Sequence, residues 1–534
     1  MKNKLLSILV ILITSNHLIG QTTPFHIHIE PMTINGLGGL QAFAYGQHDG
    51  KWLIVGGRLD GLHRRQPWAA FDVAGNNNQI IVVDPVAKQT WNAPLSSLST
   101  DLQEQLSATN MEFHQNGDYL YVIGGYGYNA ATTEKKTFDK LTAIHVPNVI
   151  HAIINSTPFT SEIRQITDSE FAVTGGHLSK INNTYYLVGG NQFDGDYNPI
   201  GNPTYTQVYT NTIRKFNMDD DGTNLTITHL PSITDAANLH RRDLNVVHQI
   251  LPSGEEGITA FSGVFQPTVN LPFLTAVTID SINHAVDNNF LQYYNHYHCA
   301  VLPLYSVSNN AMHTVFFGGI AQYYDNNGTL VQDNEVPFVK TIARVTRDQN
   351  GVLAEYKLPI EMPNYLGAGS EFIPIQSLSK YPNEVFKLDD FSQDSTLVGY
   401  IFGGISSTQK NIFFINTGSE SSASDQIFKV YVLTDSTLEI DNLNEQSIGT
   451  LNLEVFPNPN RGDFIVHFNL VEQTEVKFSL YTLDGKKLEE KVLTDLKVGK
   501  NTFERKFRSI TKGGIFLLTI ETATETVTRK IVIQ

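Results

Sequence analysis

Three short polar segments carry side chains whose types and spacing could bind or transform a ligand. Residues 58–65 supply one histidine and three arginines, residues 239–243 a histidine, two arginines and an aspartate, and residues 293–299 two histidines. Guanidinium groups bind carboxylates and other oxygen acceptors, while imidazoles move protons near neutral pH. The candidate ligand-binding residues are His63, Arg64, Arg65, His177, His240, Arg241, Arg242, Asp243, His296, His298 and Glu371.

Two of these groups have a structural alternative. The Arg241-Arg242 pair either pins neighbouring loops through bidentate bonds to carboxylates or holds an anionic or sugar ligand. His296 and His298 have the alternating spacing that places two imidazoles on one strand face, which would suit a metal. Two ligands do not make a metal site, so we predict hydrogen-bonded histidines, no metal and no cofactor. Cys299 is expected to be a small buried hydrophobe.

A repeated β-rich run that ends in Gly-Gly provides the elements that must position these residues. It occurs at residues 52–57, 120–125, 186–190, 315–319 and 400–404, and residues 260–263 form a degenerate copy. Each run is preceded by an inner strand and followed by a long variable stretch and two further strands. The pattern resembles kelch repeats, which implies an all-β fold with a six-bladed β-propeller over residues 21–434. An open pair of β-sandwiches with coincidental Gly-Gly turns is the alternative.

The two ends of this region are expected to meet. The last unit ends at a strand near residues 426–433 and lacks a fourth strand, whereas residues 25–31 have no unit of their own. Phe25, Ile27 and Ile29 alternate with polar residues, which is the period of a half-buried strand. We therefore predict that the N-terminal strand completes the sixth unit and removes an exposed sheet edge.

The loop-rich rim of the ring is the predicted functional face. In an antiparallel unit, the loops after the second strand and the links between units lie on one rim, and here those segments are long and carry the candidate residues. Entries to other inner strands add Asn110 and Glu112. Tyr297-His298 beside Cys299 invites comparison with galactose oxidase, a kelch-like copper enzyme. There the cysteine lies on a different blade from the Tyr-His pair, so a copper oxidase is not favoured.

The C-terminal residues 451–534 are a separate small domain. They contain Phe-Pro-Asn-Pro-Asn-Arg-Gly at 456–462, Tyr-x-x-Asp-Gly-Lys at 481–486 and Gly-Gly-Ile-Phe at 513–516, with alternating runs at 464–468 and 476–481 that predict strands and an Asp-Gly hairpin turn. This order of motifs resembles the type A C-terminal sorting domain of the type IX secretion system of Bacteroidetes. The resemblance implies an immunoglobulin-like β-sandwich that addresses the protein to the secretion machinery, after a polar linker at 435–450. A generic immunoglobulin-like module is the alternative.

The N-terminus and the composition agree with export. Lys2 and Lys4 precede an apolar run at 5–13, which predicts a signal peptide over residues 1–20 and is too short to span a membrane. A single cysteine excludes an intrachain disulfide, so a large core must stabilise the fold. The formal charge of −16 is unfavourable for binding nucleic acid.

Together these features predict a protein exported through the periplasm and secreted or attached to the cell surface, with no membrane span. Its loop-rich face is expected to bind a glycan or a surface protein, because recognition needs only a rigid ring and variable loops. The alternative is a carbohydrate-active enzyme, such as an epimerase, lyase or oxidase, that uses His240, Arg242, His296 and His298. Convergence of these side chains on one pocket would favour the enzyme, and separate contacts between blades would favour binding.

Overall fold

The computed structural model describes residues 24–198, 204–326, 328–391, 394–434, 446–447, 451, 453–458, 460, 462–470, 473–482, 486–506, 514–522 and 526–533. The predicted signal peptide (1–20), the turn predicted at 483–485 and most of the linker (435–450) lie outside this part. The described chain is built mainly of strands, so the predicted all-β class is confirmed. Two short α-helices, α1 (Thr100–Leu106) and α2 (Val146–Ile154), were not predicted.

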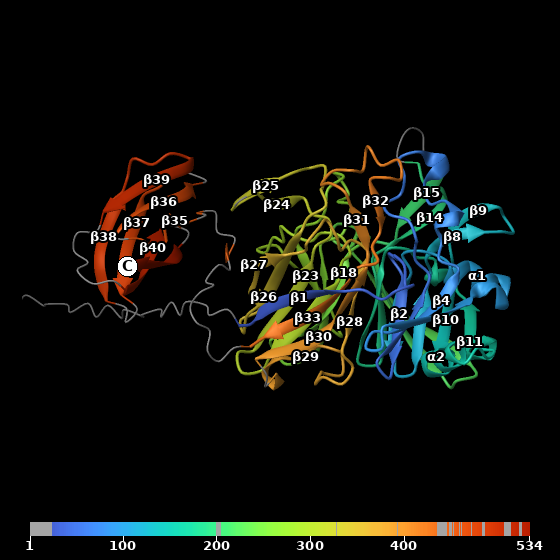
Figure 1. Cartoon of the computed structure of the whole chain (residues 1–534). Helices are drawn as coiled ribbons and strands as arrows, with labels where there is room; N and C mark the ends of the chain where they lie inside the picture. Colours follow the sequence, from blue (N-terminus) through green and yellow to red (C-terminus); the bar gives the residue numbers. More distant parts are fainter. Residues whose placement is uncertain are drawn as a thin grey trace, which may run out of the picture.

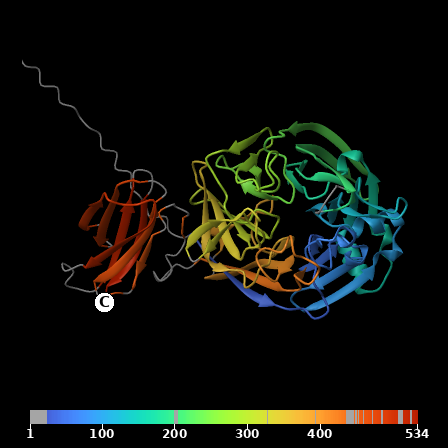
Figure 2. The ribbon, with the colours of Figure 1, turned by 90° about the horizontal axis from the view of Figure 1, so that it is seen from above.

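The described residues from 26 to 433 contain six sheets, each built on four antiparallel strands, and Figure 2 shows these sheets side by side around a ring. From the innermost strand outward, the first three are β2 (Ala44–His48), β3 (Lys51–Val55), β4 (Gln79–Asp84) and β5 (Gln89–Pro94); β6 (Glu112–Asn116), β7 (Tyr119–Ile123), β10 (Lys140–His145) and β11 (Ile163–Thr167); and β12 (His177–Ile181), β13 (Thr184–Val188), β16 (Thr212–Asp220) and β17 (Leu225–Thr234). The last three are β18 (Asn245–Ile250), β19 (Glu256–Phe261), β20 (Ala276–Ile279) and β21 (His284–Asp287); β22 (Val301–Ser306), β23 (Ala311–Phe317), β26 (Thr341–Arg347) and β27 (Leu353–Glu361); and β28 (Ser370–Pro374), β30 (Ser395–Gly403), β33 (Ile427–Leu433) and β1 (His26–Met32). The short strands β29 (Phe386–Lys387) and β34 (Gln446–Ser447) add to the fifth sheet.

The N-terminal strand is the outermost member of the sixth sheet. β1 pairs antiparallel with β33 over seven residues, from His26 opposite Leu433 to Met32 opposite Ile427. Phe25 and Ile27 are buried in a core that contains side chains of both the fifth and the sixth sheets. This is the pairing expected from the alternation of residues 25–31, and it joins the two ends of the ring.

The Gly-Gly repeat forms the junctions between neighbouring sheets. The first glycine of each pair has a positive φ, and a Cβ on Gly124 would lie 2.0 Å from the carbonyl oxygen of Val173, so no other residue fits there without a shift. The N–H of the second glycine donates to a backbone carbonyl in the segment that leads into the inner strand of the next sheet. These bonds run from Gly57 to Ala108 (2.8 Å), Gly125 to Val173 (2.9 Å), Gly190 to Arg241 (2.7 Å), Gly263 to His296 (3.0 Å), Gly319 to Leu366 (2.7 Å) and Gly404 to Leu40 (2.9 Å).

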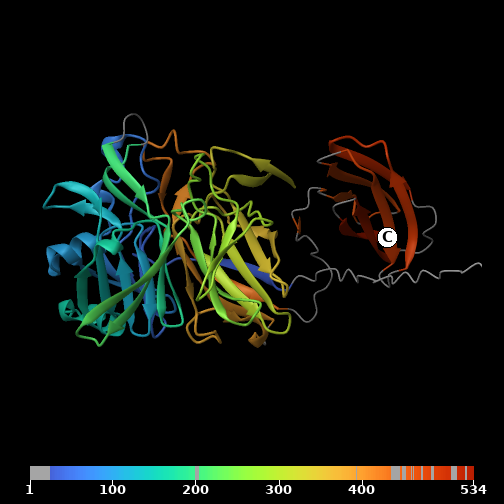
Figure 3. The same ribbon diagram turned by 180° about the vertical axis from the view of Figure 1, so that it is seen from behind.

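The loops that follow Gly-Gly form the more elaborate rim of the ring. Four of them contain two-stranded ribbons, which stand along the upper rim in Figures 1 and 3. They are β8 (Tyr126–Asn129) with β9 (Glu134–Thr137), β14 (Asn191–Asp196) with β15 (Thr204–Tyr209), β24 (Tyr323–Asn326) with β25 (Thr329–Gln332), and β31 (Ile405–Ser407) with β32 (Ser421–Ala423). The described 3-10 helices are η1 (Pro67–Ala69), η2 (Val73–Gly75), η3 (Leu95–Ser97), η4 (Thr160–Glu162), η5 (Ser169–Phe171) and η6 (Leu388–Asp390).

The C-terminal region contains two further sheets. One has the order β35 (Glu454–Phe456), β36 (Asp463–Leu470) and β39 (Gly499–Lys506), and the other the order β38 (Lys487–Leu493), β37 (Val476–Thr482), β40 (Gly514–Glu521) and β41 (Thr526–Ile533). The strands predicted at 464–468 and 476–481 fall within β36 and β37. Phe464, Phe468, Phe478 and Leu518 from both sheets are buried in one core, which gives this region its own hydrophobic centre.

Candidate functional site

Six equivalent residues at the entries to the inner strands are joined by a closed ring of backbone hydrogen bonds. Each N–H donates to the carbonyl of the equivalent residue in the preceding sheet, and the last bond returns to the first sheet. The bonds run from Asn110 to Ala42 (3.2 Å), Gly175 to Asn110 (3.0 Å), Asp243 to Gly175 (2.7 Å), His298 to Asp243 (2.8 Å), Gly369 to His298 (2.9 Å) and Ala42 to Gly369 (2.8 Å). This inner ring holds the side chains at and around these positions in one small region.

Within the inner ring, His177, His298 and Glu371 come together from the third, fifth and sixth sheets. Nε2 of His298 lies 3.1 Å from Oε1 of Glu371, and the His177 and His298 ring centroids are 6.3 Å apart. Burial opposes a positive charge on His298. The carboxylate of Glu371, with a smaller contribution from Asp243, outweighs this effect of burial and raises the pKa of His298. Burial and neighbouring histidines lower the pKa of His177 well below its usual value. The pKa values of these two neighbouring imidazoles are therefore shifted in opposite directions.

Further polar groups lie around these three residues. Asn110 donates to the Asp243 carboxylate (Nδ2 to Oδ1, 3.3 Å), and Glu112 accepts a bond from the N–H of Gly176 (2.7 Å). Burial raises the pKa of Glu112 well above its usual value, so this carboxyl favours the protonated form. His114 and His248 face each other at 5.9 Å between ring centroids, and burial lowers their pKa values to about 3 and about 4.

Arg242 is surrounded by tyrosines. Its guanidinium forms an ion pair with Asp243, and Nε donates to the hydroxyl oxygen of Tyr209 (3.2 Å). Burial disfavours the charge on Arg242. The negative charge of Asp243 has the larger opposing effect, and together with Tyr209, Tyr297 and Tyr197 it raises the pKa of Arg242. The arginine and the three tyrosines are all half-buried. Tyr197 and Tyr209 belong to the ribbon loop of the third unit, and Arg242 and Tyr297 lie in the segments that lead into β18 and β22. They form a polar and aromatic group beside the inner ring, which we call the tyrosine–arginine cluster.

Two candidate histidines pack against this cluster. His240 stacks on Tyr209 with ring centroids 3.8 Å apart, and its Nδ1 lies 2.7 Å from Oδ1 of Asn211. His63 lies 4.5 Å from Tyr197 between ring centroids, and burial is the main cause that lowers its pKa to about 4. Tyr197 and Tyr209 were missed in the sequence, where the only signal was a tyrosine-rich stretch after the third Gly-Gly.

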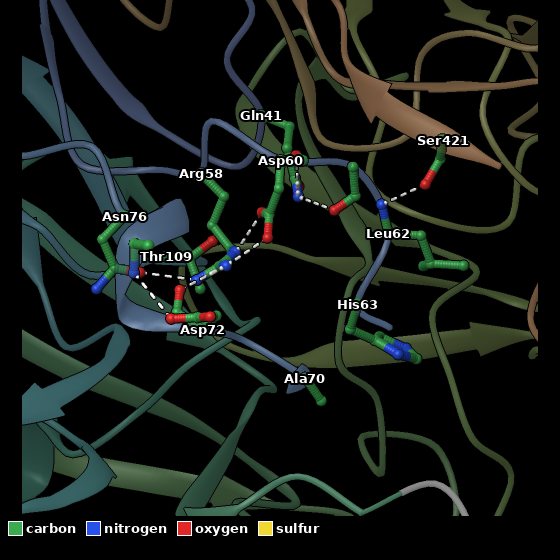
Figure 4. Close-up of polar contacts among 12 residues, drawn as sticks. Gln41, Arg58, Asp60, Leu62, His63, Ala70, Asp72, Asn76, Thr109 and Ser421 are labelled. Atoms are coloured by element: carbon green, nitrogen blue, oxygen red, sulfur yellow. Dashed lines mark hydrogen bonds and ion pairs between the residues drawn. The ribbon is translucent and has the colours of Figure 1, made fainter. Parts of the chain in front are cut away.

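A buried arginine fixes the loop that carries His63. Arg58 binds both carboxylate oxygens of Asp60 at 2.6 Å, and it also donates to Oδ1 of Asn76 (2.7 Å) and to the carbonyl of Asp72 (2.9 Å) (Figure 4). These bonds tie together the two ends of the loop after the first Gly-Gly. The loop is therefore a preformed part of the rim, and Arg58 is occupied by structural contacts.

Arg241 and His296 do not belong to the site. Arg241 is fully buried, donates to the carbonyls of Asn238 (2.5 Å), Ser262 (2.8 Å) and Thr275 (2.8 Å), and lies 4.1 Å from the ring centre of Phe273. His296 is also buried, and both ring nitrogens bond to backbone groups, of Gln292 and Gln322, at 2.8 Å. Each side chain is thus enclosed by loop backbone.

The prediction that His296 and His298 share a strand face was wrong. β22 begins only at Val301, so both residues lie in the preceding irregular segment, where His296 turns into the protein and His298 toward Glu371. Cys299 is buried, as predicted. Arg64 and Arg65 are exposed. In the described residues, no three His, Cys, Asp or Glu side chains are grouped so that they could hold a metal.

We expect Arg241→Ala to destabilise the ring by about 3–5 kcal/mol, because three buried carbonyls lose charged donors and a cavity remains. Arg242→Ala is the matched control and should cost about 1 kcal/mol or less, because the side chain is partly solvated and its ion pair is local. Urea unfolding of both variants measures the difference. Equal losses of stability would contradict the assignment of Arg241 as the structural member of the pair.

Stability should fall as the pH is lowered from about 6.5 to about 4. Burial lowers the pKa values of His63, His248 and His296 to about 4, whereas an unfolded histidine has a pKa near 6.5. In that range the unfolded chain takes up protons that the folded chain rejects, which costs at most about 1.4 kcal/mol per pH unit for each histidine. Melting curves across this range test the expectation, and His248→Gln should flatten the slope.

His298→Gln should show the opposite pH dependence. The raised pKa of His298 means that its stabilising contribution is fully present at low pH and disappears as the pH rises through that value. The variant should therefore lose most stability in acid and least in alkali. A loss that is independent of pH would contradict the His298–Glu371 ion pair.

Comparisons with known proteins identify the C-terminal region. Residues 454–534 match the family model of the secretion system C-terminal sorting domain. No curated protein matches the chain in sequence. Among solved structures, the chain resembles one titled "Structure of YjhT" (11% identity, 74% of this chain and 98% of that chain, TM-score 0.40). Another is a fungal alcohol oxidase of the AA5 family in complex with copper (10% identity, 96% of this chain and 100% of that chain, TM-score 0.38).

At these TM-scores the two structural similarities say nothing about activity. The sorting domain, in contrast, indicates how the protein is exported. None of the helices in the described part of the chain has the length and apolarity that crossing a membrane requires. The C-terminal match confirms the predicted type IX sorting signal, so the chain is a protein that the type IX machinery delivers to the cell surface or the medium.

Proposed function

We propose that this protein is an exported kelch-like propeller that binds a glycan at the mouth of its central channel. In this proposal a signal peptide (1–20) directs the chain to the periplasm, and residues 21–434 form six blades closed by the N-terminal strand. A linker (435–450) joins them to an immunoglobulin-like sorting domain (451–534). A surface protein is the alternative ligand on the same face.

The observation that carries the proposal is the tyrosine–arginine cluster beside the inner ring. Tyr197, Tyr209 and Tyr297 are half-buried aromatic side chains that carry a hydroxyl, the combination that suits a pyranose ring. His240 covers one face of Tyr209, and the Tyr209 hydroxyl accepts from Arg242, so a ligand would meet the remaining accessible parts of the three side chains. Arg242 donates from Nε to Tyr209 and from Nη1 to Asp243, and within the described residues its Nη2 is left for a ligand oxygen. The ring of backbone bonds holds these groups in place, which lowers the entropy lost on binding.

A glycan array with the purified full chain tests the proposal. Arg242→Gln and Tyr209→Ala should each weaken binding of the selected glycan by about 10–100-fold, the loss expected for a charged hydrogen bond or an aromatic contact. Lys88→Gln, in the turn between β4 and β5 on the opposite rim, is the control and should leave affinity unchanged. If no glycan binds, or if Arg242→Gln binds as tightly as the parent, the proposal fails.

A carbohydrate-active enzyme is the second candidate, and the contact between His298 and Glu371 favours it. His177 and His298 favour opposite protonation states at 6.3 Å, which suits transfer of a proton to and from one substrate. Of the residues first considered for catalysis, only Arg242 and His298 lie at this site, since His296 is enclosed by backbone and His240 is stacked on Tyr209. His298→Gln should then abolish conversion of the bound glycan, followed by NMR, while leaving its affinity within about threefold. Unchanged turnover would exclude His298 as the acid.

A further inference from the structure

A second exposed surface on the loop-rich rim combines aromatic, aliphatic and cationic side chains. We call it the arginine–tryptophan patch, and it consists of Arg64, Arg65, Trp68, Phe414 and Ile415. Trp68 is 84% exposed, Phe414 67% and Ile415 46%, and both arginines are exposed. Trp68 lies three residues after Arg65, and Phe414 and Ile415 directly precede Asn416, which bonds to Arg65, so these exposed apolar side chains lie on two adjacent loops. Large apolar side chains at such exposure are costly to leave in water, which indicates a binding surface.

The two loops that carry the patch are joined by hydrogen bonds. Asn416 is fully buried, and its Nδ2 donates to the carbonyls of Leu62 (2.7 Å) and His63 (3.0 Å), while its own carbonyl accepts from the N–H of Arg65 (2.9 Å). Leu62 also donates its N–H to Oγ of Ser421 (3.0 Å) (Figure 4). The first and sixth sheets thus present one preformed surface.

The charge of the patch is not neutralised locally. Neither Arg64 nor Arg65 has a carboxylate at ion-pair distance within the described residues. Glu420, on the same loop as Phe414, accepts from the N–H groups of Thr417 (2.7 Å) and Ser419 (3.2 Å), so its carboxylate is engaged in holding that loop. The two guanidinium groups give this patch a local positive charge on a chain whose net charge is −16, so the patch favours an anionic ligand that contacts it at short range, where the charge of the rest of the chain is screened by salt.

We propose that the arginine–tryptophan patch binds an acidic polysaccharide, with uronate carboxylates on Arg64 and Arg65 and a pyranose face against Trp68. Guanidinium groups match carboxylates in geometry, and aromatic faces match the C–H faces of sugars. The patch is continuous with the channel mouth, because His63 precedes Arg64 and packs on Tyr197. The inference rests on the proposed glycan binding and adds the charge class of the glycan and a second contact surface.

Affinity electrophoresis of the full chain in gels with polygalacturonate, alginate or neutral dextran tests this inference. We expect retardation by the two acidic polymers, weakening steeply between 50 and 500 mM salt, and none by dextran. The double variant Arg64→Gln/Arg65→Gln and the single variant Trp68→Ala should each weaken binding by about tenfold, in line with two exposed charge pairs or one aromatic contact. Lys88→Gln and Val86→Ala, on the opposite rim, are matched controls for charge and exposed apolar area.

The outcomes separate this inference from the proposed function. Retention by neutral glycans alone, weakened by Arg242→Gln, would keep the proposed function and overturn the acidic ligand. Binding of acidic polymers that the patch variants leave unchanged would also overturn it. If neither acidic nor neutral glycans bind, both proposals fall. The three substituted patch residues, Arg64, Arg65 and Trp68, are exposed, so melting curves equal to the parent are expected and would confirm that any loss of binding is local.

Discussion

Removal of residues 22–30 should destabilise the whole ring in a single cooperative transition. The deletion takes away most of β1, exposes the edge of β33 and removes Phe25 and Ile27 from the core between the fifth and sixth sheets. The point variant Phe25→Ala removes only a buried aromatic ring and should cost about 3–5 kcal/mol. Urea unfolding followed by circular dichroism measures both changes.

Two controls distinguish closure of the ring from a general loss of chain. Ile282→Ala changes an apolar side chain that is 74% exposed in a hairpin turn, and it should alter stability by less than about 0.5 kcal/mol. Deletion of linker residues 435–445 leaves β1, β33 and their pairing complete, and it should matter little. A protein without residues 22–30 that unfolds at the parent's urea midpoint would contradict the structural role of β1.

Removal of residues 451–534 should abolish delivery to the cell surface and the medium while leaving a folded ring. The sorting domain match covers 454–534, and the side chains of this region form a core of their own. The truncated protein should therefore be retained in the cell envelope and should melt at the same temperature as the ring in the full chain. Immunoblots of envelope and medium fractions, together with a melting curve, measure both effects.

A point variant in the core of the C-terminal domain is the control for this truncation, because it keeps the full chain and disturbs only that domain. Phe478→Ala removes a buried ring shared by both C-terminal sheets and should unfold this domain alone, at a cost of about 3–5 kcal/mol. We expect the variant to be retained in the envelope as well. Normal amounts of the truncated protein in the medium would contradict the sorting role of the tail.

Local sequence patterns determined the elements of this protein and several of their contacts. The alternation of residues 25–31 predicted β1, because a period of two is typical of a strand with one face on a core. The missing fourth strand of the last unit predicted its pairing with β33. The Gly-Gly repeat predicted the units, since each first glycine is a position where a neighbouring carbonyl leaves no room for a Cβ. The ordered C-terminal motifs predicted the sorting signal. The helix α2 was missed although its buried residues Val146, Val149, Ile150 and Ile153 have helical spacing.

The sequence named several residues of the site, including His177, Arg242, His298 and Glu371, but only the tertiary structure decided which candidates come together there. Arg241 and Arg242 are neighbours in sequence, yet one is buried in loop backbone and the other lies among tyrosines. Arg242 forms a β-bridge with Val264, and successive side chains of an extended segment point to opposite sides. His296 and His298 separate for a similar reason, since the strand that would align them begins later. Tyr197, Tyr209 and Glu371 reach the site from sheets far apart in the chain. Their proximity depends on how the sheets close into a ring, and a local pattern contains no information about that closure.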